Sequence, residues 1–208
     1  MRIVAGKFRS RILKPVRDLE LRPTSDRLRE TLFNILGDEV VDSIFVDCYA
    51  GTGAVGIEAL SRGARQVIFI EKHGATAGLI RANLLALDVN MSMARGAASE
   101  VEVTNTDARR GLTQLSERGV HADYIFMDPP YADIRQCLKL MERIGEQKFA
   151  EGLLAPGGRI ILEHAAWDKV PDDVGVVHRT RILKQGDSAL SFFRWRSAAG
   201  DVAAAEST

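Results

Sequence analysis

Short apolar runs alternate with helix-like segments along most of this chain, and this alternation constrains the fold more than any other feature. The runs are rich in branched and aromatic side chains, whereas the segments between them place apolar residues three and four positions apart. Strands joined by helices form parallel sheets covered on both faces, so we predict an α/β fold with a mostly parallel sheet. The strand-like runs are residues 43–47, 66–71, 99–107, 122–128 and 158–163, and the helix-like segments are residues 54–63, 75–88, 108–117 and 134–144.

The C-terminal part of the chain follows another pattern. Residues 174–183 and 188–196 both have the composition of strands, and only "KQGD" separates them. Such a loop is too short for the crossover that parallel strands need, so we predict an antiparallel pair. Residues 197–208 lack large apolar side chains, and we expect a disordered tail there.

The N-terminal region is predicted to form a hairpin followed by a helix. Residues 2–8 and 10–16 are short apolar-polar runs around a glycine-containing turn, which is typical of a hairpin. In "RPTSDRLRETLFNILG", Thr24 or Ser25 can cap a helix, and leucine and isoleucine then recur at helical spacing until Gly37 ends it.

Basic side chains are concentrated near the N-terminus, although the net charge of the 208-residue chain is zero. Residues 1–36 carry nine Lys and Arg against four Asp and Glu, a net charge of about +5. The segment is either an ordinary solvated surface or a lobe that contacts phosphates. The candidate phosphate contacts are Arg9, Arg11, Arg22 and Arg29, although Arg27 or Arg29 can instead pair with Glu30 on the helix surface.

The length and the cysteine content favour one sizeable domain, with room for a small appendage, in a reducing compartment. Cys48 and Cys137 are far apart and have no partners at metal-binding spacing, so we expect reduced thiols and no metal site. The start "MRIVAGKFRS" has no apolar signal core, and no stretch reaches the roughly 20 apolar residues of a membrane span. We therefore expect a cytoplasmic protein, and a monomer.

A glycine-rich loop follows the first predicted strand and opens a helix. In "VDCYAGTGAVG", Gly51, Gly53 and Gly56 match the dinucleotide fingerprint, and Glu71 follows about 20 residues later, where a carboxylate can accept the hydroxyls of an adenosine ribose. The alternative interpretation is that these glycines form a tight turn and bind no ligand. Two ligands fit the loop, a dinucleotide and S-adenosylmethionine (SAM), and Asp47 before it suits an ammonium group, which a pyrophosphate lacks.

Two further positions complete this predicted ligand site. A ligand carboxylate can lie at the helix start near Ala54 and Val55, where backbone N–H groups are free to donate. Asp107 follows the third strand in "NTDA", where an adenine would lie in the crevice of a doubly wound sheet. Asp107 can equally be the N-cap of the helix over residues 108–117, and the two roles are compatible.

The fourth predicted strand ends in "DPPY", residues 128–131. In a doubly wound sheet its carboxyl end faces the same crevice as the glycine loop. The Asp128 carboxylate and the Pro129 carbonyl can accept the two N–H bonds of an exocyclic amino group, and Pro130 holds Pro129 in an extended geometry. Tyr131 offers a flat face for stacking a base. In isolation the segment could also be only a stiff turn.

Those two acceptors explain how a poor nucleophile can react. The lone pair of an exocyclic amino group is delocalised into the base, and acceptors on both N–H bonds favour a more tetrahedral nitrogen. Transfer of a methyl group from a sulfonium then needs mainly in-line placement, which can contribute about 7–11 kcal/mol. Asp128 or water can take the proton that the product amine loses.

Taken together, these stretches resemble a known enzyme family. "DCYAGTGAVGIEALSRGA" and "DPPY" are similar to the cofactor loop and the amino-group motif of class I SAM-dependent N-methyltransferases. The N-terminal "RPTSDRLRETLFNIL", with the hairpin before it, narrows the resemblance to the bacterial 16S ribosomal RNA guanine-N2 methyltransferases of the RsmD type. The resemblance covers residues 2 to about 196.

This resemblance implies a Rossmann-like fold whose seven-stranded, mostly parallel sheet has an antiparallel last strand. It implies a basic, RNA-contacting lobe over residues 1–37 and a methyltransferase domain over residues 38–196, followed by the tail. It implies 16S rRNA within an assembling small ribosomal subunit as the partner, and Asp128 and Pro129 as the residues that hold the guanine amino group. Pro130 and Tyr131 complete the predicted catalytic set. The SAM cofactor would be bound by Asp47, Ala50, Gly51, Thr52, Gly53, Glu71, Asp107 and Ala108.

Three other functions stay open from the residues alone. The same acceptor geometry serves DNA adenine-N6 and protein-glutamine methyltransferases, although a DNA reader would need an added recognition segment. An NAD-dependent oxidoreductase fits the glycine fingerprint but leaves "DPPY" unexplained. A non-catalytic ribosome-binding module would not need Asp128.

Overall fold

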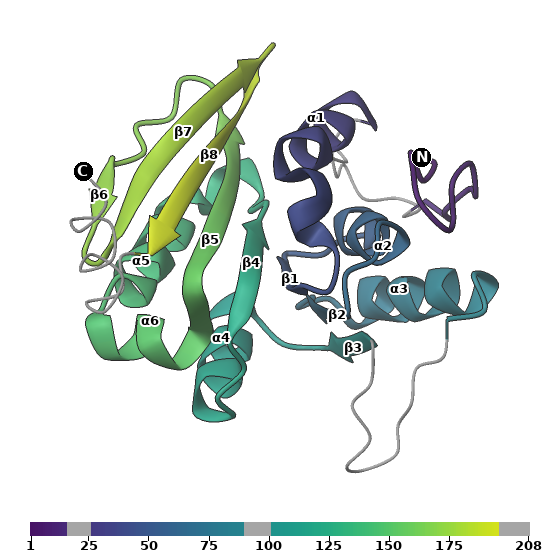
Figure 1. Ribbon diagram of the computed structural model, residues 1–208, viewed down its shortest axis with the longest axis horizontal. Coiled ribbons are helices and arrows are strands. Elements are labelled where there is room, and N and C mark those ends of the chain that lie inside the picture. Colours follow the sequence, from purple (N-terminus) through teal and green to yellow (C-terminus); the bar gives the residue numbers. More distant parts are fainter. Residues whose placement is uncertain (16–25, 90–100, 196–208) are drawn as a thin grey trace. The chain divides into compact units, whose positions relative to one another are not determined.

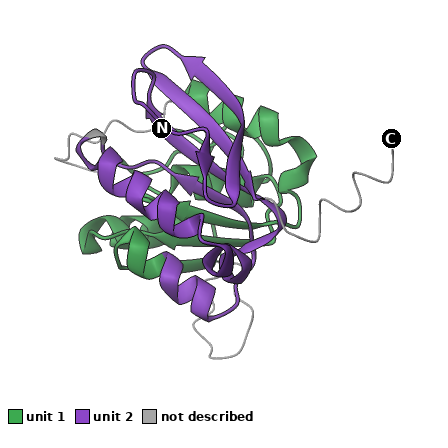
Figure 2. Ribbon diagram, turned by 90° about the vertical axis from the view of Figure 1, so that its left-hand side faces the viewer, with its two compact units in different colours: residues 1–111 green, residues 112–208 purple. Residues whose placement is uncertain are grey.

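The computed structural model describes residues 1–15, 26–89 and 101–195 (Figure 1). The chain divides into two compact units, residues 1–111 and residues 112–208 (Figure 2). The expected tail, residues 197–208, and the expected caps Thr24 and Ser25 lie outside the described residues. Within the described residues, every helix is too short or too polar to cross a bilayer.

Three parallel strands form the sheet of the first unit, in the order β3-β2-β1. The strands β1 (Ile44–Cys48) and β2 (Gln66–Ile70) are buried in all but their first residue, as expected for runs covered on both faces. The shorter β3 (Val101–Thr104) is half-buried beyond its first residue. The helices α2 (Ala54–Ser61) and α3 (Gly74–Ala86) connect the strands and confirm the predicted alternation.

The N-terminal region of the first unit also follows the prediction in outline. The helix α1 (Asp26–Leu36) buries its leucine stripe and ends before Gly37, whose φ of +57° suits glycine. The short 3-10 turn η1 (Gly37–Val40) follows it. The expected hairpin is reduced to one antiparallel bridge between Arg2 and Ile12.

The second unit contains one parallel pair of strands and an antiparallel extension. Its strands are β4 (Ala122–Met127), β5 (Leu154–Ala165), β6 (Asp173–Val174), β7 (Val177–Gln185) and β8 (Ser188–Trp195), in the order β4-β5-β8-β7-β6. The β4–β5 pair is parallel, whereas the pairs β5–β8, β7–β8 and β6–β7 are antiparallel. The short loop before Ser188 forces this antiparallel turn, as predicted.

Helices follow β4 in the second unit. The turn η2 (Tyr131–Asp133) leads into α5 (Ile134–Ile144), which buries Cys137, Leu140, Met141 and Ile144 at helical spacing. The helix α6 (Gln147–Leu153) was not predicted, because it is too short to show a clear apolar period. The helix α4 (Ala108–Glu117) contains the division between the two units.

The fold class is confirmed. Helices connect parallel strands, and the C-terminal strands are antiparallel, as in a Rossmann-like α/β fold. The two-residue β6 adds a short strand to the seven expected. Cys48 and Cys137 are both buried and free of a disulfide. The proposed division at residue 37 stays a prediction about function, because residues 1–37 share one compact unit with the glycine loop.

Candidate functional site

The loop between β1 and α2 needs its glycines for two different reasons. Gly51 and Gly53 have φ values of +54° and +79°, a left-handed region that favours glycine. Gly56 has an ordinary backbone, but a Cβ there would lie 2.3 Å from the Phe69 ring of β2. The first two glycines therefore shape the turn, and Gly56 allows α2 to pack closely on the sheet, as the fingerprint requires.

Tyr49 is a residue of this loop that sequence reasoning missed. Its φ is +59°, which is uncommon for a residue with a Cβ and costs about 1–3 kcal/mol. Strained backbone of this kind clusters at ligand-binding turns. No sequence signal marks it, because tyrosine has no preference for this conformation.

Asp47 lies at the carboxyl end of β1 and is 2% exposed. Its Oδ2 accepts a hydrogen bond of 2.8 Å from the Gly56 N–H in α2. Burial raises the pKa of Asp47 to about 8, the Gly56 bond lowers it in part, and the Glu71 carboxylate adds to the rise. A cationic ligand group nearby would favour the charged carboxylate, in line with the predicted ammonium contact.

Glu71 directly follows β2 and is nearly buried. Its Oε2 accepts the Gly51 N–H at 2.9 Å, and its Oε1 accepts the His73 N–H at 2.8 Å. These bonds fix the orientation of the carboxylate and tie it to the glycine loop. Each oxygen keeps a second lone pair, so the predicted ribose contact remains chemically open.

Two polar residues with distinct tasks follow the third strand. Asn105 donates from Nδ2 to the carbonyls of Glu71 and Lys72 at 2.9 and 3.0 Å, so it joins the ends of β2 and β3. Asp107 is exposed and its Oδ1 accepts the Arg110 N–H at 2.9 Å, which confirms the N-cap of α4. The adenine contact of Asp107 and Ala108 stays a prediction, and Asn105 was not foreseen.

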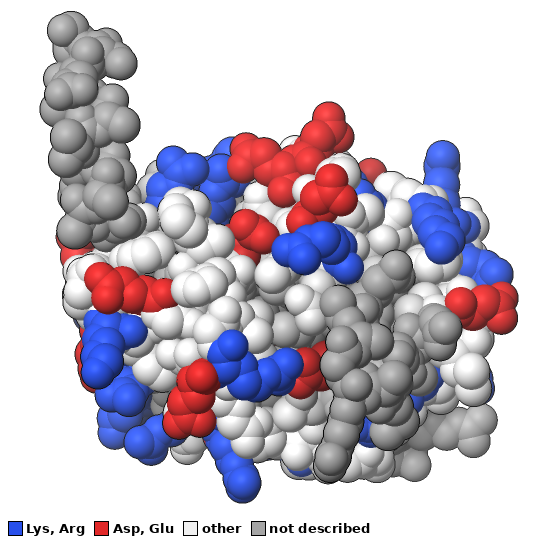
Figure 3. All heavy atoms as spheres, turned by 60° about the horizontal axis from the view of Figure 1, so that its bottom comes forward, with Lys and Arg blue, Asp and Glu red and all other residues white. Residues whose placement is uncertain are grey.

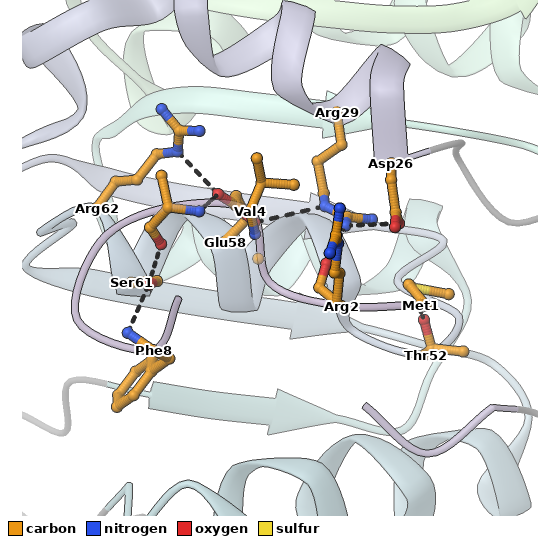
Figure 4. Close-up of polar contacts among 12 residues, drawn as sticks. Met1, Arg2, Val4, Phe8, Asp26, Arg29, Thr52, Glu58, Ser61 and Arg62 are labelled. Carbon is orange, nitrogen blue, oxygen red and sulfur yellow. Dashed lines mark hydrogen bonds and ion pairs between the residues drawn. The ribbon is translucent and has the colours of Figure 1, made fainter. Parts of the chain in front are cut away.

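The N-terminal segment is attached directly to the loop and to α2. Asn83 of α3 donates to the Thr52 carbonyl at 3.1 Å and accepts the Lys14 N–H at 2.9 Å. The buried carboxylate of Glu58 in α2 accepts the N–H groups of Val4 and Ala5 at 2.8 and 3.0 Å (Figure 4). The loop, α2 and the N-terminal segment are therefore held in one polar network within the first unit.

Arg29 belongs to this network, and its predicted phosphate contact is not supported by its position. The side chain is fully buried, and its guanidinium lies 2.9 Å from the Asp26 carboxylate and 3.5 Å from that of Glu58 (Figure 4). It also donates to the Arg2 carbonyl at 2.5 Å. Arg29 faces the buried carboxylate of Glu58 and reaches the exposed carboxylate of Asp26 one helical turn before it.

The other candidate RNA contacts fall into two groups. Arg9 and Arg11 are exposed, and Arg11 donates to the Ala86 carbonyl at 2.5 Å. Arg22 lies outside the described residues. On the face drawn in Figure 3, basic and acidic side chains are interspersed, in agreement with the net charge of zero.

The Asp-Pro-Pro-Tyr segment directly follows β4 in the second unit. Asp128 is half-buried, Pro129 is buried and Pro130 is exposed. Pro130 has φ −51° and ψ 143°, and its carbonyl accepts the Asp133 N–H at 2.7 Å at the start of η2. Two proline rings and this turn restrict the backbone at the end of the strand. The side chain of Tyr131 is outside what the structure describes.

A comparison with protein families shows which family this chain belongs to. The family described as "Conserved hypothetical protein 95" matches residues 1–194. The chain belongs to this family. The RsmD-type resemblance expected from the motifs is thereby confirmed.

Individual relatives agree with this membership. The chain is 38% identical over 148 residues to "Ribosomal RNA small subunit methyltransferase D" of Escherichia coli (strain K12), covering 70% of this chain and 68% of the relative. It is 32% identical over 197 residues to YlbH of Bacillus subtilis (strain 168), covering 94% of this chain and all of YlbH. The solved structure of yhhF from Escherichia coli has a TM-score of 0.74 at 33% identity, covering 94% of this chain and 98% of that one.

Proposed function

We propose that this protein transfers a methyl group from SAM to the exocyclic N2 of a guanine in 16S rRNA of the small ribosomal subunit. The observation that carries the proposal is the family match over residues 1–194, together with the relative named as a small-subunit rRNA methyltransferase. The guanine and its N2 rest on "DPPY" and on the RsmD-type N-terminal block.

The first unit supplies the proposed SAM site. Asp47 takes the amino acid ammonium, and the start of α2 takes the ligand carboxylate, since its first N–H groups lack helical partners. Glu71 accepts the ribose hydroxyls with a carboxylate already oriented by Gly51 and His73. The full proposed set is Asp47, Ala50, Gly51, Thr52, Gly53, Glu71, Asp107 and Ala108.

The second unit supplies the groups that act on the base. The Asp128 carboxylate and the Pro129 carbonyl accept the two N–H bonds of the guanine amino group, and Tyr131 stacks on the ring. The nitrogen lone pair then forms the N–C bond while the S–C bond of the sulfonium breaks, and the sulfur keeps that electron pair. The proton lost from the methylated nitrogen passes to Asp128 or to water.

The N-terminal lobe is the proposed docking surface for the RNA. Arg9, Arg11 and Arg22 remain its candidate phosphate contacts, because basic side chains supply the sequence-independent part of nucleic acid binding. Arg29 contributes to the fold of the lobe instead. We propose that the target is an rRNA-protein particle in the cytoplasm, where subunits are assembled.

The experiment that tests the function uses labelled SAM and small ribosomal subunits from cells that lack the protein. We expect label in N2-methylguanosine after nuclease digestion and mass spectrometry. Naked 16S rRNA, double-stranded DNA with target adenines, and a glutamine-containing peptide serve as competing substrates. Label in methyladenine or methylglutamine, or no label in any RNA, would refute the assignment.

A further inference from the structure

The second unit carries a tryptophan that the proposed reaction does not use. Trp167 is 69% exposed, whereas the other tryptophan of the chain, Trp195, is 6% exposed. Indole rings have a large apolar face and are usually buried when nothing binds them. A single exposed apolar side chain is common, so the position of Trp167 has to carry the argument.

Trp167 follows the carboxyl end of β5, and β5 pairs with β4, the strand that leads into Asp128. The strands β4 and β5 are parallel, and Met127 lies opposite Leu162, so Asp128 follows at the level of Glu163. Two further residues bring β5 to its end at Ala165, about 7 Å beyond that level at about 3.3 Å per residue. In Figure 1, β5 and the β7–β8 hairpin extend past the end of β4. Trp167 therefore lies just beyond the residues that hold the target base.

The turn that presents Trp167 is held by its own hydrogen bonds. The Ala165 N–H donates to the Asp168 Oδ2 at 2.9 Å, and the Asp168 N–H donates back to the Ala165 carbonyl at 2.9 Å. The Ala166 N–H donates to the Asp187 carbonyl of the β7–β8 turn at 2.8 Å. An aromatic ring on such a turn loses little conformational freedom when it stacks on a ligand.

The strand beneath the turn is also fixed. The ring of the buried His164 contacts the Ser191 Oγ of β8 at 2.9 Å and the Ala165 carbonyl at 2.8 Å. Charged side chains of both signs occur in this region, with Lys169, Arg179 and Lys184 against Asp168, Asp172 and Asp187, and Arg179 pairs with Asp172. The aromatic face, and not a basic patch, is therefore the distinctive feature of this surface.

We infer that Trp167 stacks on an unpaired base next to the target guanine and so helps to select the RNA. This inference rests on the proposed function and adds a specificity residue to it. Sequence-selective RNA recognition commonly splays bases out and stacks them on aromatic side chains, and a flipped target leaves its neighbours unstacked. Trp167 acts on substrate binding and takes no part in the transfer of the methyl group.

The kinetic test compares Trp167→Ala with Trp167→Phe and wild type, on small ribosomal subunits and on naked 16S rRNA. Stacking on a base contributes about 1–3 kcal/mol, so we expect Trp167→Ala to raise KM for RNA about 5- to 150-fold. Turnover at saturating RNA and affinity for SAM should stay near wild type, and Trp167→Phe should recover most of the loss. Val41→Ala, at an exposed valine of the first unit, is the control for loss of an exposed apolar side chain.

A spectroscopic test separates base stacking from other roles. In Trp195→Phe, Trp167 is the remaining tryptophan. A single-stranded RNA oligonucleotide should quench its fluorescence if the indole stacks on a base. Unchanged KM in Trp167→Ala with an active wild type overturns the inference alone, whereas an inactive wild type overturns the proposed function. If Trp167→Ala raises KM for small ribosomal subunits but RNA does not quench the Trp167 fluorescence, Trp167 contacts a ribosomal protein instead. That result too overturns the inference.

Discussion

At the scale of single residues, Asp128 is where the proposed chemistry can be tested most directly. Asp128→Ala removes one of the two proposed acceptors of the guanine amino group, which is also the proposed proton acceptor. We expect turnover to fall about 10²- to 10⁴-fold, the usual range for loss of a general base. SAM affinity, measured by calorimetry, should stay close to wild type, because the proposed cofactor residues all lie in the first unit. A parallel loss of SAM affinity would contradict the role given to Asp128.

Asp47 links the candidate cofactor site to pH. Burial raises its pKa to about 8 in the folded protein, whereas the ordinary pKa of an aspartate is 3.8. Between these two pH values Asp47 is protonated in the folded protein and ionised in the unfolded chain. The contribution of Asp47 to the free energy of unfolding therefore falls as pH rises from about 4 to about 8. Asp47→Asn should flatten the dependence of the free energy of unfolding on pH over that range.

Urea unfolding of wild type and Asp47→Asn at pH 5 and pH 8.5 measures this effect. Asp88→Asn, at an exposed carboxyl of the same unit, is the matched control. If Asp47→Asn keeps the full pH dependence of wild type, the carboxyl is ionised in the folded protein and the raised pKa is wrong.

At the scale of elements, the contact between α2 and β2 depends on Gly56. A Cβ at this position would lie 2.3 Å from the Phe69 ring, so the helix must shift or the ring must move. Gly56→Ala should lower the free energy of unfolding by about 1–3 kcal/mol, as overpacking does. It should also weaken SAM binding, since α2 carries the loop.

The control for this substitution is Gly78→Ala in α3, where an added Cβ meets nothing within 4 Å. There the better helix propensity of alanine should raise stability by up to about 1 kcal/mol. In urea unfolding, we expect Gly56→Ala to lower the free energy of unfolding and Gly78→Ala to raise it. Equal effects of the two substitutions would show that α2 does not pack on β2 as described.

The helices α1 and α2 and the N-terminal segment are coupled through Glu58. Its carboxylate is fully buried and faces Arg29 at 3.5 Å and Arg62 at 2.9 Å. Glu58→Gln leaves the Arg29 guanidinium buried with less charge compensation and should cost about 3–5 kcal/mol. The bonds to Val4 and Ala5 weaken as well, so the N-terminal segment should become more sensitive to proteolysis.

The double variant Glu58→Gln/Arg29→Met separates charge from packing. It removes both buried charges, so it should be less destabilised than Glu58→Gln alone in urea unfolding. Additive losses in the double variant would mean that the two side chains act independently.

At the scale of the whole molecule, ligand binding should stabilise the fold. A ligand at 100 times its Kd adds about 2.7 kcal/mol to the free energy of unfolding, so SAM should raise Tm. NAD at the same concentration should have little effect, because Asp47 and the "DPPY" segment suit SAM and methyl transfer. A Tm shift with NAD alone would favour the oxidoreductase reading.

Many of the helices and strands, and the type of chemistry, can be predicted from local sequence. Periodicity predicted α4 and α5 with their observed bounds, because each is long enough to show an apolar stripe. The "KQGD" loop predicted the antiparallel β7–β8 pair from its length alone. The glycine loop and "DPPY" carry unusual residue types at element ends, which is why chemistry could be inferred there before any geometry.

Other features depend on contacts between residues that are distant in sequence. Arg29 looks like an exposed cation in the sequence, and only the tertiary structure places it at the buried carboxylate of Glu58. The strained Tyr49, the Asn105 link and the exposed Trp167 have no local signal, because backbone strain and burial are set by tertiary packing. Local patterns thus determined the elements and the type of chemistry, whereas tertiary structure decided which charged side chains are enclosed and which aromatic ring is presented.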